Sequence, residues 1–368
     1  MSEATSVVTR AAARSAWARR LQGWQGALVP VAAVVVALMI GAVVLVGLGA
    51  DPVKAYSSML EGAFGSVSGF TQTLVTATPL LLVGLGVTIA FRGGVINIGG
   101  EGQLIVGALA ASAAALYLPL PGVLLLLAAL IAGVLGGALW GAVPGALKAQ
   151  LGVNEILSTI MMNQIAIQLA NYLLRGPMID PKEVEAGTRI AQSALLPADS
   201  WLVRLVPRTL LHGGSILALV MAVAVFFLLW RTTVGYRIRA VGLNPDAARY
   251  AGIPVKRYQM LALILGGAFA GLAGAVEVLG VQHRMLEGLS GGYGFSGIVA
   301  ALFGKLHPLG LIPASVLFGG LLVGGDKMQR SVQVPDALIV ALLGLVVLFV
   351  VGSDYIMRKR AAKAQSHE

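Results

Sequence analysis

The sequence has no cysteine and only four histidines, which lie far apart at His212, His283, His307 and His367. Without thiols the chain forms neither disulfide bonds nor cysteine metal sites, and it has no thiol nucleophile. The histidines also lack the spacing of metal ligands. We therefore expect no metal site and no cysteine-based chemistry in this chain.

Motifs for enzymatic chemistry are missing as well. The Gly-x-x-x-x-Gly-Lys-Ser/Thr run that holds ATP phosphates does not occur, since Gly304-Lys305 is followed by Leu306 and lacks the upstream loop. The sequence also shows no Ser/His/Asp or His-Glu-x-x-His arrangement. These absences argue against an enzyme, and against a protein that is powered by an ATP site of its own.

Charged residues are scarce: they make up 11% of the chain, hydrophobic residues make up 57%, and the mean hydropathy is +0.86. Ordinary soluble domains carry about 25% charged residues, so this composition indicates a membrane protein. A helix needs about 20 apolar residues to cross the hydrocarbon core of a bilayer. Ten apolar windows predict an all-α polytopic membrane protein with about ten spans: 27–49, 73–91, 103–118, 122–143, 155–174, 213–230, 258–281, 293–304, 309–324 and 335–352.

The Lys and Arg residues favour one orientation of these spans. With the N-terminus in the cytoplasm, the inner segments hold about two thirds of the 26 Lys and Arg residues, as the positive-inside rule requires. We predict a basic cytoplasmic tail at 1–26, a single transmembrane domain at 27–355 and a second basic cytoplasmic tail at 356–368. The protein would be a multi-pass protein of the cell inner or plasma membrane. Its net charge of +10 then reflects topology and contact with anionic lipid, with no nucleic-acid partner.

The segment 231–257 is a basic loop on the predicted cytoplasmic side, and it carries the signals of a short helix. Asn244 can accept hydrogen bonds from the free amides of a helix start, and Pro245 suits the first helical position. Asp246 complements the positive end of the helix dipole, and Gly252 suits the end of the helix. The pattern predicts a helix of about two turns at the membrane surface, a useful contact for another protein.

Glycine is dense at the junction of the second and third windows, where five of the residues 93–102 are glycine. Each glycine costs about 1 kcal/mol in a helix relative to alanine, so the helix must break here. In transporters such breaks commonly face the substrate route, because irregular backbone needs protein or a water-filled cavity around it. Asn97, Glu101 and Gln103 would supply polar groups to that route. The alternative is a glycine-rich cytoplasmic turn with a solvated Glu101.

A second glycine-rich break at 288–297 follows the seventh window. The first break follows an inward-going span and the second an outward-going span, so both could occupy equivalent positions of an inverted repeat. The repeat would relate spans 2–5 to spans 7–10. Two breaks on the same side of the membrane in unrelated folds would contradict it. The short windows 293–304 and 309–324 also indicate a re-entrant or broken helix.

The fifth window is unusually polar for a membrane span. Helical spacing places Gln164, Gln168 and Asn171 on one face and Glu155, Thr159 and Asn163 on another. Faces this polar should avoid lipid, so they either hydrogen-bond to neighbouring helices or line a hydrated passage. Glu277 is the one carboxylate predicted at membrane depth; such a residue is either functional, or protonated or paired with a backbone donor.

Two further patterns concern packing and the outer surface. Glycines at four-residue intervals, Gly133 to Gly145 in the fourth window and Gly267 and Gly271 in the seventh, predict close helix packing. The segment 175–212 lies on the predicted outer side and is either a landing surface for an external partner or a disordered connector. Within it, residues 201–206 suggest an amphipathic helix at the interface.

Four segments of the chain are similar to the permease subunits of ABC importers: 97–103, 152–163, 239–253 and 292–304. The resemblance covers about residues 27–355 in consistent order, and the broad family includes ribose-type and branched-chain amino acid permeases. The Asn-Ile-Gly-Gly-Glu-Gly-Gln run at 97–103 and the Gly-Tyr-Gly-Phe run at 292–295 are most similar to the nucleoside branch, often labelled simple-sugar permeases. One departure is Gly100, where relatives commonly have alanine.

The resemblance implies a multi-subunit importer of a nucleoside or related simple sugar. This chain would form the translocation pathway with a second permease, commonly a paralogous chain. Two cytoplasmic ATPases would hold ATP and Mg²⁺, so this chain itself would bind no cofactor, and an external substrate-binding lipoprotein would deliver the solute. The alternative is a proton- or sodium-coupled secondary transporter in which Glu101 and Glu277 exchange cations.

The same resemblance assigns roles to residues. The helix at 244–252 would be the coupling helix in an ATPase cleft, and the residues expected to serve coupling are Arg237, Arg239, Asn244, Pro245, Asp246, Ala248, Arg249 and Gly252. Aromatic faces suit a nucleobase and amides suit ribose hydroxyls, although a sugar could use both. The residues expected along the substrate pathway are Asn97, Glu101, Gln103, Glu155, Asn163, Gln164, Glu277, Tyr293 and Phe295.

Overall fold

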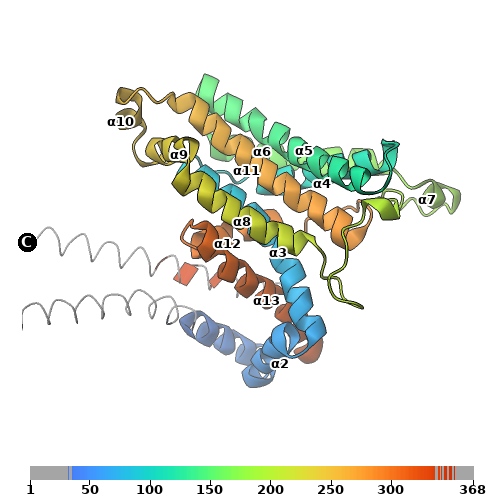
Figure 1. Ribbon diagram of the computed structural model, residues 1–368. Helices are drawn as coiled ribbons and strands as arrows, with labels where there is room; N and C mark the ends of the chain where they lie inside the picture. The colour runs from blue at the N-terminus through green and yellow to red at the C-terminus, as the bar shows by residue number, and fades with distance from the viewer. Residues whose placement is uncertain are drawn as a thin grey trace, which may run out of the picture. The chain divides into compact units, whose positions relative to one another are not determined.

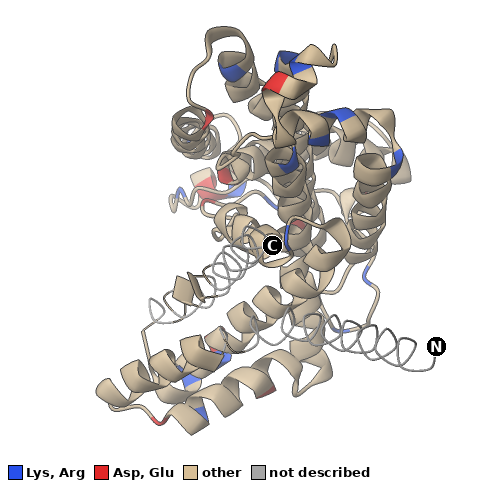
Figure 2. Ribbon diagram, turned by 90° about the vertical axis from the view of Figure 1, so that its left-hand side faces the viewer, with Lys and Arg blue, Asp and Glu red and all other residues tan. Residues whose placement is uncertain are grey.

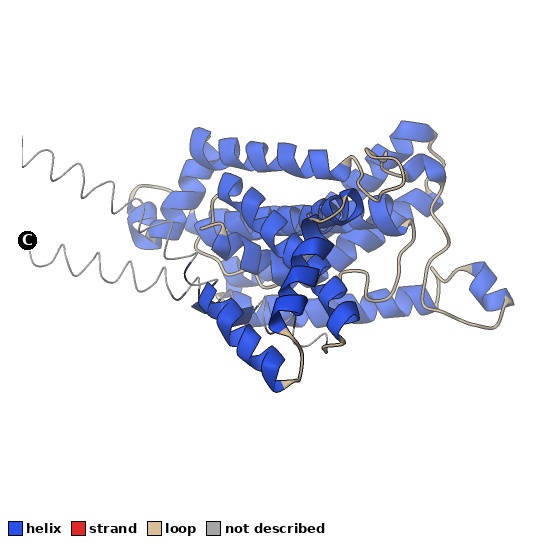
Figure 3. Ribbon diagram, turned by 90° about the horizontal axis from the view of Figure 1, so that it is seen from below, coloured by secondary structure: helices blue, strands red, loops and turns tan. Residues whose placement is uncertain are grey.

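The computed structural model describes residues 35–335 without a gap, together with residues 32, 339, 341, 344, 345, 348, 349 and 352. Over these residues the chain is helical, with connecting loops and no strand (Figure 3). Charged side chains occupy few positions along the ribbon (Figure 2). The tails predicted at 1–26 and 356–368, the start of the first window and most of the window 335–352 lie outside the described residues.

The described residues form two compact units. One contains the residues up to Ser58 and those from Gly325 onward, and the other is Met59–Gly324. In the first unit, the hydroxyl of Tyr56 donates a hydrogen bond of 2.6 Å to the carbonyl of Leu38, which joins the helix Val35–Gly47 to α2 (Pro52–Phe64). The sequence analysis missed α2, because its apolar positions are interrupted by polar residues.

The second unit contains most of the apolar helices. Five helices are long and apolar enough to cross a membrane: α3 (Val67–Arg92), α5 (Gly122–Leu151), α8 (Gly214–Arg231), α11 (Val255–Glu277) with its π-helical extension η2 (Val278–Gln282), and α13 (Pro308–Val332). The windows at 103–118 and 155–174 correspond to α4 (Gly100–Tyr117) and α6 (Glu155–Arg175). The eighth window is α12 (Tyr293–Phe303), whose 11 residues are too few to cross a bilayer, so it is a half-helix as the sequence indicated.

Helices α3 and α11 form the interior of this unit, and α5 packs closely against α11. A Cβ atom added to Gly137 of α5 would lie 2.2 Å from the carbonyl oxygen of Gly267, and one added to Gly271 would lie 2.3 Å from that of Gly133. The backbones can approach this closely only because these positions carry no side chain. The packing role predicted for these glycines is confirmed.

The two predicted surface segments lie at opposite ends of the long helices (Figure 1). One end carries α9 (Thr233–Leu243) and α10 (Pro245–Tyr250), and the other carries α7 (Pro181–Glu185) and η1 (Ala198–Ser200). We refer to them as the α10 end and the α7 end. Their separation agrees with the alternation of spans, whereas the assignment of the α10 end to the cytoplasm stays a prediction.

The segment between α6 and α8 is folded onto the α7 end of α11. The backbone N–H of Leu202 donates to the carbonyl of Leu279 at 3.0 Å, and that of Leu196 to the carbonyl of His283 at 2.9 Å. The alternative of a disordered connector is therefore wrong. The amphipathic helix predicted at 201–206 is also absent, because the backbone N–H of Leu202 bonds to Leu279 of η2 and that of Leu205 bonds to Leu211 rather than within a helix.

Candidate translocation site and coupling helix

The two glycine-rich breaks meet inside the helical unit. The first is the loop 93–99 between α3 and α4, and the second is the segment 283–292 between η2 and α12. A Cβ atom added to Gly294 would lie 2.3 Å from the backbone nitrogen of Glu101, so the first turns of α4 and α12 touch through their backbones. The inverted repeat that would relate spans 2–5 to spans 7–10 stays a prediction.

Glu101 links these two helix starts. Its side chain accepts a hydrogen bond from the hydroxyl of Ser290 and another, at 2.8 Å, from the backbone N–H of Gly294. Gly292, at the N-cap position of α12, has no side chain to satisfy that helix start, so Glu101 supplies the acceptor from another helix. Glu101 is only 6% exposed, and the alternative of a solvated turn is wrong.

Asn97 and Gln103 form a reciprocal amide pair. The Nδ2 of Asn97 donates to the Oε1 of Gln103 at 3.0 Å, and the Nε2 of Gln103 donates to the Oδ1 of Asn97 at 3.3 Å. The same Oδ1 accepts from the backbone N–H of Gly99 at 2.9 Å. Both side chains are 1% exposed, so the pair fixes the broken backbone from within.

Asn163 of α6 holds the same loop from the other side. Its Oδ1 accepts from the backbone N–H of Gly102 at 2.9 Å, and its Nδ2 donates to the carbonyl of Ile98 at 3.0 Å. One amide group thus satisfies a donor and an acceptor that the break leaves without helical partners. The structure brings Asn97, Gln103 and Asn163 together around the first break. Asn163 thus bonds to a neighbouring part of the chain, the alternative to lining a hydrated passage, and the pathway role of the three residues stays a prediction.

The two aromatic candidates lie on the first turn of α12, next to this cluster. Tyr293 is half-buried, and its backbone N–H donates to the carbonyl of Ser290 at 2.8 Å. The ring of Phe295 is 49% exposed. Phe295 therefore presents an open aromatic face beside the junction of the two breaks.

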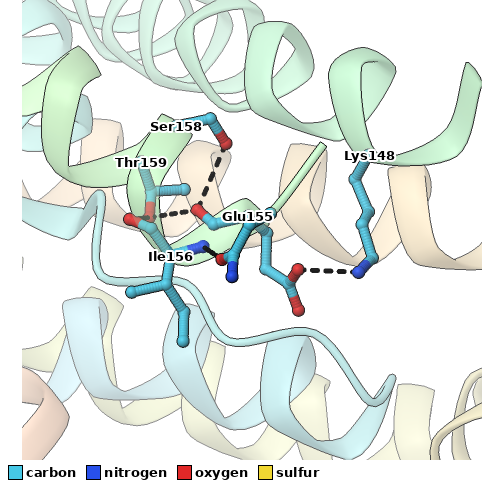
Figure 4. A network of polar contacts seen from close by, with 6 residues as sticks. Lys148, Glu155, Ile156, Ser158 and Thr159 are labelled. Atoms are coloured by element: carbon cyan, nitrogen blue, oxygen red, sulfur yellow. Dashed lines mark hydrogen bonds and ion pairs between the residues drawn. The ribbon is translucent and has the colours of Figure 1, made fainter. Parts of the chain in front are cut away.

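Three other candidates do not take part in this hydrogen-bonded cluster, although Glu155 lies against the first break through a hydrogen bond from the backbone of Ile96. The Glu155 carboxylate pairs with the Lys148 ammonium at 2.8 Å across the short turn between α5 and α6, while its carbonyl accepts from Ser158 and Thr159 (Figure 4). Gln164 is exposed, on a different face of α6 from Asn163. Glu277 is the last residue of α11 and receives a hydrogen bond from Gln282, which places it near the α7 end. Glu277 is 5% exposed and Glu101 is 6% exposed, so the fold buries two carboxylates where the sequence singled out one; the position of Glu277 at membrane depth stays a prediction.

The helix predicted at 244–252 is present as α10. The Oδ1 of Asn244 accepts from the backbone N–H groups of Asp246 and Ala247, both at 3.0 Å, and Pro245 occupies the first helical position. The helix ends before Gly252, whose φ of +77° suits glycine. Local sequence signals are sufficient to predict α10, because Asn244 sets its start and Gly252 follows its end.

The two sides of α10 differ. Ala248 is 4% exposed and packs with Val241 of α9 and Val255 of α11. Tyr250 is 94% exposed and Leu243, just before the helix, is 86% exposed. The sequence analysis did not single out these two apolar groups. Tyr250 could have been found, since it stands two positions after the buried Ala248 and therefore on the opposite side.

The arginines of the coupling segment have unequal roles. Arg239 donates to the carbonyl of Leu229 at 2.9 Å, and its guanidinium lies 5.5 Å from the ring of Trp230. Arg237 donates to the hydroxyl of Tyr258 at 3.0 Å. Arg249 forms an exposed pair with Asp246 at 3.2 Å within α10. Thus Arg237 and Arg239 connect α9 to α11 and α8, whereas Arg249 lies on α10 and pairs within that helix.

Trp230 connects the α9–α10 region to the rest of the unit. The guanidinium of Arg92, at the end of α3, lies 5.5 Å from the Trp230 ring, as that of Arg239 does. The Nε of Arg92 also donates to the carbonyl of Leu306, between α12 and α13, at 3.0 Å. These contacts join α9, α8, α3 and the end of α12 in one chain of interactions.

Comparison with known proteins places this arrangement in a family. The sequence model described as branched-chain amino acid transport system / permease component matches residues 69–351. The glucose ABC transporter permease protein TsgB13 of Haloferax volcanii is 36% identical over 94% of this chain and 92% of its own length. The guanosine ABC transporter permease protein NupP of Bacillus subtilis is 38% identical over 90% of this chain and 94% of its own. The nucleoside ABC transporter permease protein NupB of Lactococcus lactis subsp. cremoris is 32% identical over 92% of this chain and 94% of its own length. With its helical membrane architecture, the chain therefore belongs to this permease family and is a transmembrane permease subunit of an ABC importer.

Proposed function

We propose that the chain carries a nucleoside through the membrane, and that the junction of the two breaks is part of the pathway. Two of the similar proteins are named for guanosine or nucleosides and one for glucose, all of them uncharged solutes. The observation that carries the proposal is that Glu101, the carboxylate that joins the first turns of α4 and α12, has both oxygens hydrogen-bonded. A cation would have to displace these hydrogen bonds to reach the carboxylate, whereas the half-exposed Phe295 offers an aromatic face to a nucleobase.

In this proposal the energy comes from outside the chain. Cytoplasmic ATPase subunits bind ATP and Mg²⁺ and receive α10 in a cleft, where Tyr250 and Leu243 become buried. Displacement of α10 passes to α9 and α11 through Ala248 and then through Trp230 to α3. The passage then switches between outward and inward access as a rigid-body transition of packed helices. This chain binds no cofactor.

The remaining components follow from the same assignment. A second, paralogous permease chain completes the pathway, and an external substrate-binding lipoprotein docks at the α7 end, where residues 176–213 form a folded surface. Both termini and the α10 end lie in the cytoplasm, as the distribution of Lys and Arg favours. The complex is located in the inner or plasma membrane and contacts its lipid.

Uptake by the reconstituted complex tests this function. Proteoliposomes that contain the permease pair and the ATPases, with the binding protein added outside, should accumulate radiolabelled guanosine only when ATP is enclosed. A complex whose ATPase lacks its P-loop lysine is the control and should give no uptake. Preferential accumulation of glucose, or accumulation driven by a proton or sodium gradient without ATP, would overturn the proposal.

The secondary-transporter alternative receives no support. Family membership assigns the chain to an ATP-driven system. In addition, cation exchange at Glu101 would have to break its hydrogen bonds to Ser290 and Gly294, which hold the start of α12.

A further inference from the structure

One face of α6 is polar over its second half and exposed. The face runs from Gln164 to Arg175, and its side chains lie within about 100° of one another around the helix axis. We call them the α6 stripe: Gln164, Gln168, Asn171, Tyr172 and Arg175. The opposite side of the helix packs inward through small or buried residues such as Ala166 and Ala170.

The amides of the α6 stripe have no hydrogen-bond partner among the residues that the structure describes. Gln164 and Gln168 are exposed, and Asn171 is half-buried. A membrane helix does not present such amides to lipid, because their unsatisfied polar groups are costly in hydrocarbon. Of the two roles left open by the sequence, bonding to neighbouring helices of the same chain is wrong for these residues. They face either water or another subunit.

The stripe is hollowed at the α7 end. A recess of about 540 Å³ is lined by Gln168, Asn171, Tyr172, Arg175 and Gly176, and we call it the α6 recess. Its volume lies within the range of about 300–1,000 Å³ that is usual for small-molecule sites. The recess is open and its walls come from α6 and Gly176 alone, so its polar groups face a space that water can enter unless another subunit fills it.

The polar part of this face covers only half of the membrane. Gln164 and Arg175 are about 16 Å apart along the helix axis, roughly half of the 30 Å hydrocarbon core. Towards the α10 end the same face continues with Met161 and Leu157, which are 58% and 64% exposed. A solvated passage along α6 would therefore open at the α7 end and reach an apolar stretch near the middle.

The chemistry of the α6 recess selects a neutral solute. Its one charged group, Arg175, pairs with Glu287 at 3.0 Å, so the recess carries no free charge. Tyr172 is 71% exposed and offers a ring face. Gln168 and Asn171 add two amides, each of which can donate and accept hydrogen bonds. A ring with hydrogen-bonding edges fits these groups better than an ion or an aliphatic amino acid.

We propose that the α6 recess is the mouth of the translocation passage at the α7 end, where Tyr172 stacks on the ring of a nucleoside and Gln168 and Asn171 bond to its polar edge. The proposal rests on the proposed function and names where the solute first contacts this chain. A second permease closes the open side of the stripe, and Met161 and Leu157 separate the mouth from the α10 end.

The absence of cysteine permits a direct test of water access. Single cysteines at Gln164, Gln168 and Tyr172 are introduced into the assembled complex, with cysteines at Ile131 and Leu139 of α5 as controls; these two are 57% and 69% exposed on an apolar helix. A charged, membrane-impermeant methanethiosulfonate should label the three stripe positions and not the controls, whereas a lipid-soluble maleimide should label the controls. Absence of labelling at Gln168→Cys and Tyr172→Cys by the charged reagent would overturn the proposal.

Solute contact is tested on the same chain. Guanosine delivered by the binding protein should slow labelling of Gln168→Cys at least severalfold, and glucose should slow it less. Tyr172→Ala should raise the KM of guanosine uptake about tenfold, because stacking of a base on an aromatic ring contributes about 1–3 kcal/mol. Tyr172→Phe, which keeps the ring, is the matched control and should restore the KM. Equal KM values for the Ala and Phe variants would contradict the stacking.

These measurements separate the two proposals. Labelling at the α6 stripe without any guanosine uptake would refute the nucleoside assignment and the stacking role, while it would support a water-filled mouth. Guanosine uptake with the stripe unreactive towards the charged reagent would refute the mouth and leave the importer assignment intact.

Discussion

The carboxylate of Glu101 accepts a hydrogen bond of 2.8 Å from the backbone N–H of Gly294, 193 positions later in the chain. Two helix starts that are remote in sequence are thereby held against each other by one side chain. Because Glu101 also lies in the first turn of its own helix, its negative charge complements the positive dipole ends of both α4 and α12. The contact fixes the relative position of α4 and α12, whose first turns flank the candidate pathway.

Removal of this carboxylate should loosen α12. Glu101→Ala leaves the N–H of Gly294 and the hydroxyl of Ser290 without acceptors, at a cost of about 1–3 kcal/mol for each buried group. We expect a lower melting temperature of the purified complex and little uptake, and a smaller loss for Glu101→Gln, which keeps one acceptor. A melting temperature of Glu101→Ala equal to that of the unmodified protein would speak against this role.

The exposed groups of α10 should matter for assembly rather than for folding. Tyr250→Ala and Leu243→Ala remove side chains that touch little of their own chain, so the free energy of unfolding should change by less than about 0.5 kcal/mol. The ATPase subunits should copurify poorly with either variant, and uptake should fall at least tenfold. Normal copurification would show that the docking surface lies elsewhere.

Ala248 provides the contrasting case on the same helix. Ala248→Leu would force a larger side chain between Val241 and Val255, which costs about 1–3 kcal/mol in a packed site. This variant should lose stability as well as coupling, as seen by thermal unfolding in detergent. Unchanged stability would mean that α10 can move away from α9 and α11 without cost.

Trp230 should be required to couple ATP hydrolysis to transport. Trp230→Leu keeps an apolar side chain but removes the ring on which Arg92 and Arg239 lie, each contact worth about 0.5–2 kcal/mol. We expect ATP hydrolysis to persist while uptake per ATP falls. Trp230→Phe, which retains a ring, should recover part of the loss; proportional loss of both activities would indicate a general folding defect instead.

Acid should weaken the attachment of the segment 192–213. Burial, together with the nearby positive charge of Arg204 and the ring of His283, lowers the pKa of His212 to about 4. Its ring lies against Gly280, and its Nδ1 accepts from the backbone N–H of Gly214 at 3.1 Å. Because the pKa in the folded state is below the ordinary value of about 6.5, the neutral ring stabilises the fold above pH 6.5. That contribution, about 3 kcal/mol, is lost as the pH falls from about 6.5 to 4.

Limited proteolysis measures this effect. Cleavage within 192–213 should increase between pH 7 and pH 5 in the unmodified protein. His212→Gln, which cannot be protonated, should show a flatter pH dependence. A cleavage rate that does not change with pH in the unmodified protein would contradict the prediction.

The sequence predicted the membrane class, most helices, the short α10 and both glycine-rich breaks, because each of these is determined by local residue types. It did not predict that Glu101 bonds to Gly294 or that Asn163 holds the first break, since these contacts join residues far apart in the chain. For the same reason it did not predict that Glu277 ends α11 near the α7 end, away from the first break, so the pathway roles of Glu155, Gln164 and Glu277 stay predictions. The amphipathic helix at 201–206 was wrong because tertiary hydrogen bonds outweighed local periodicity.

The contact of Gly137 with Gly267 makes α5 and α11 move as one rigid pair of helices. No side chain separates the two backbones, so neither helix can slide or tilt without the other. Since only four residues separate the end of α10 from the start of α11, a displacement of α10 moves both helices together. The exposed apolar surface of α5 then moves within the bilayer during each transport cycle. We therefore expect the turnover rate to depend on membrane thickness and fluidity.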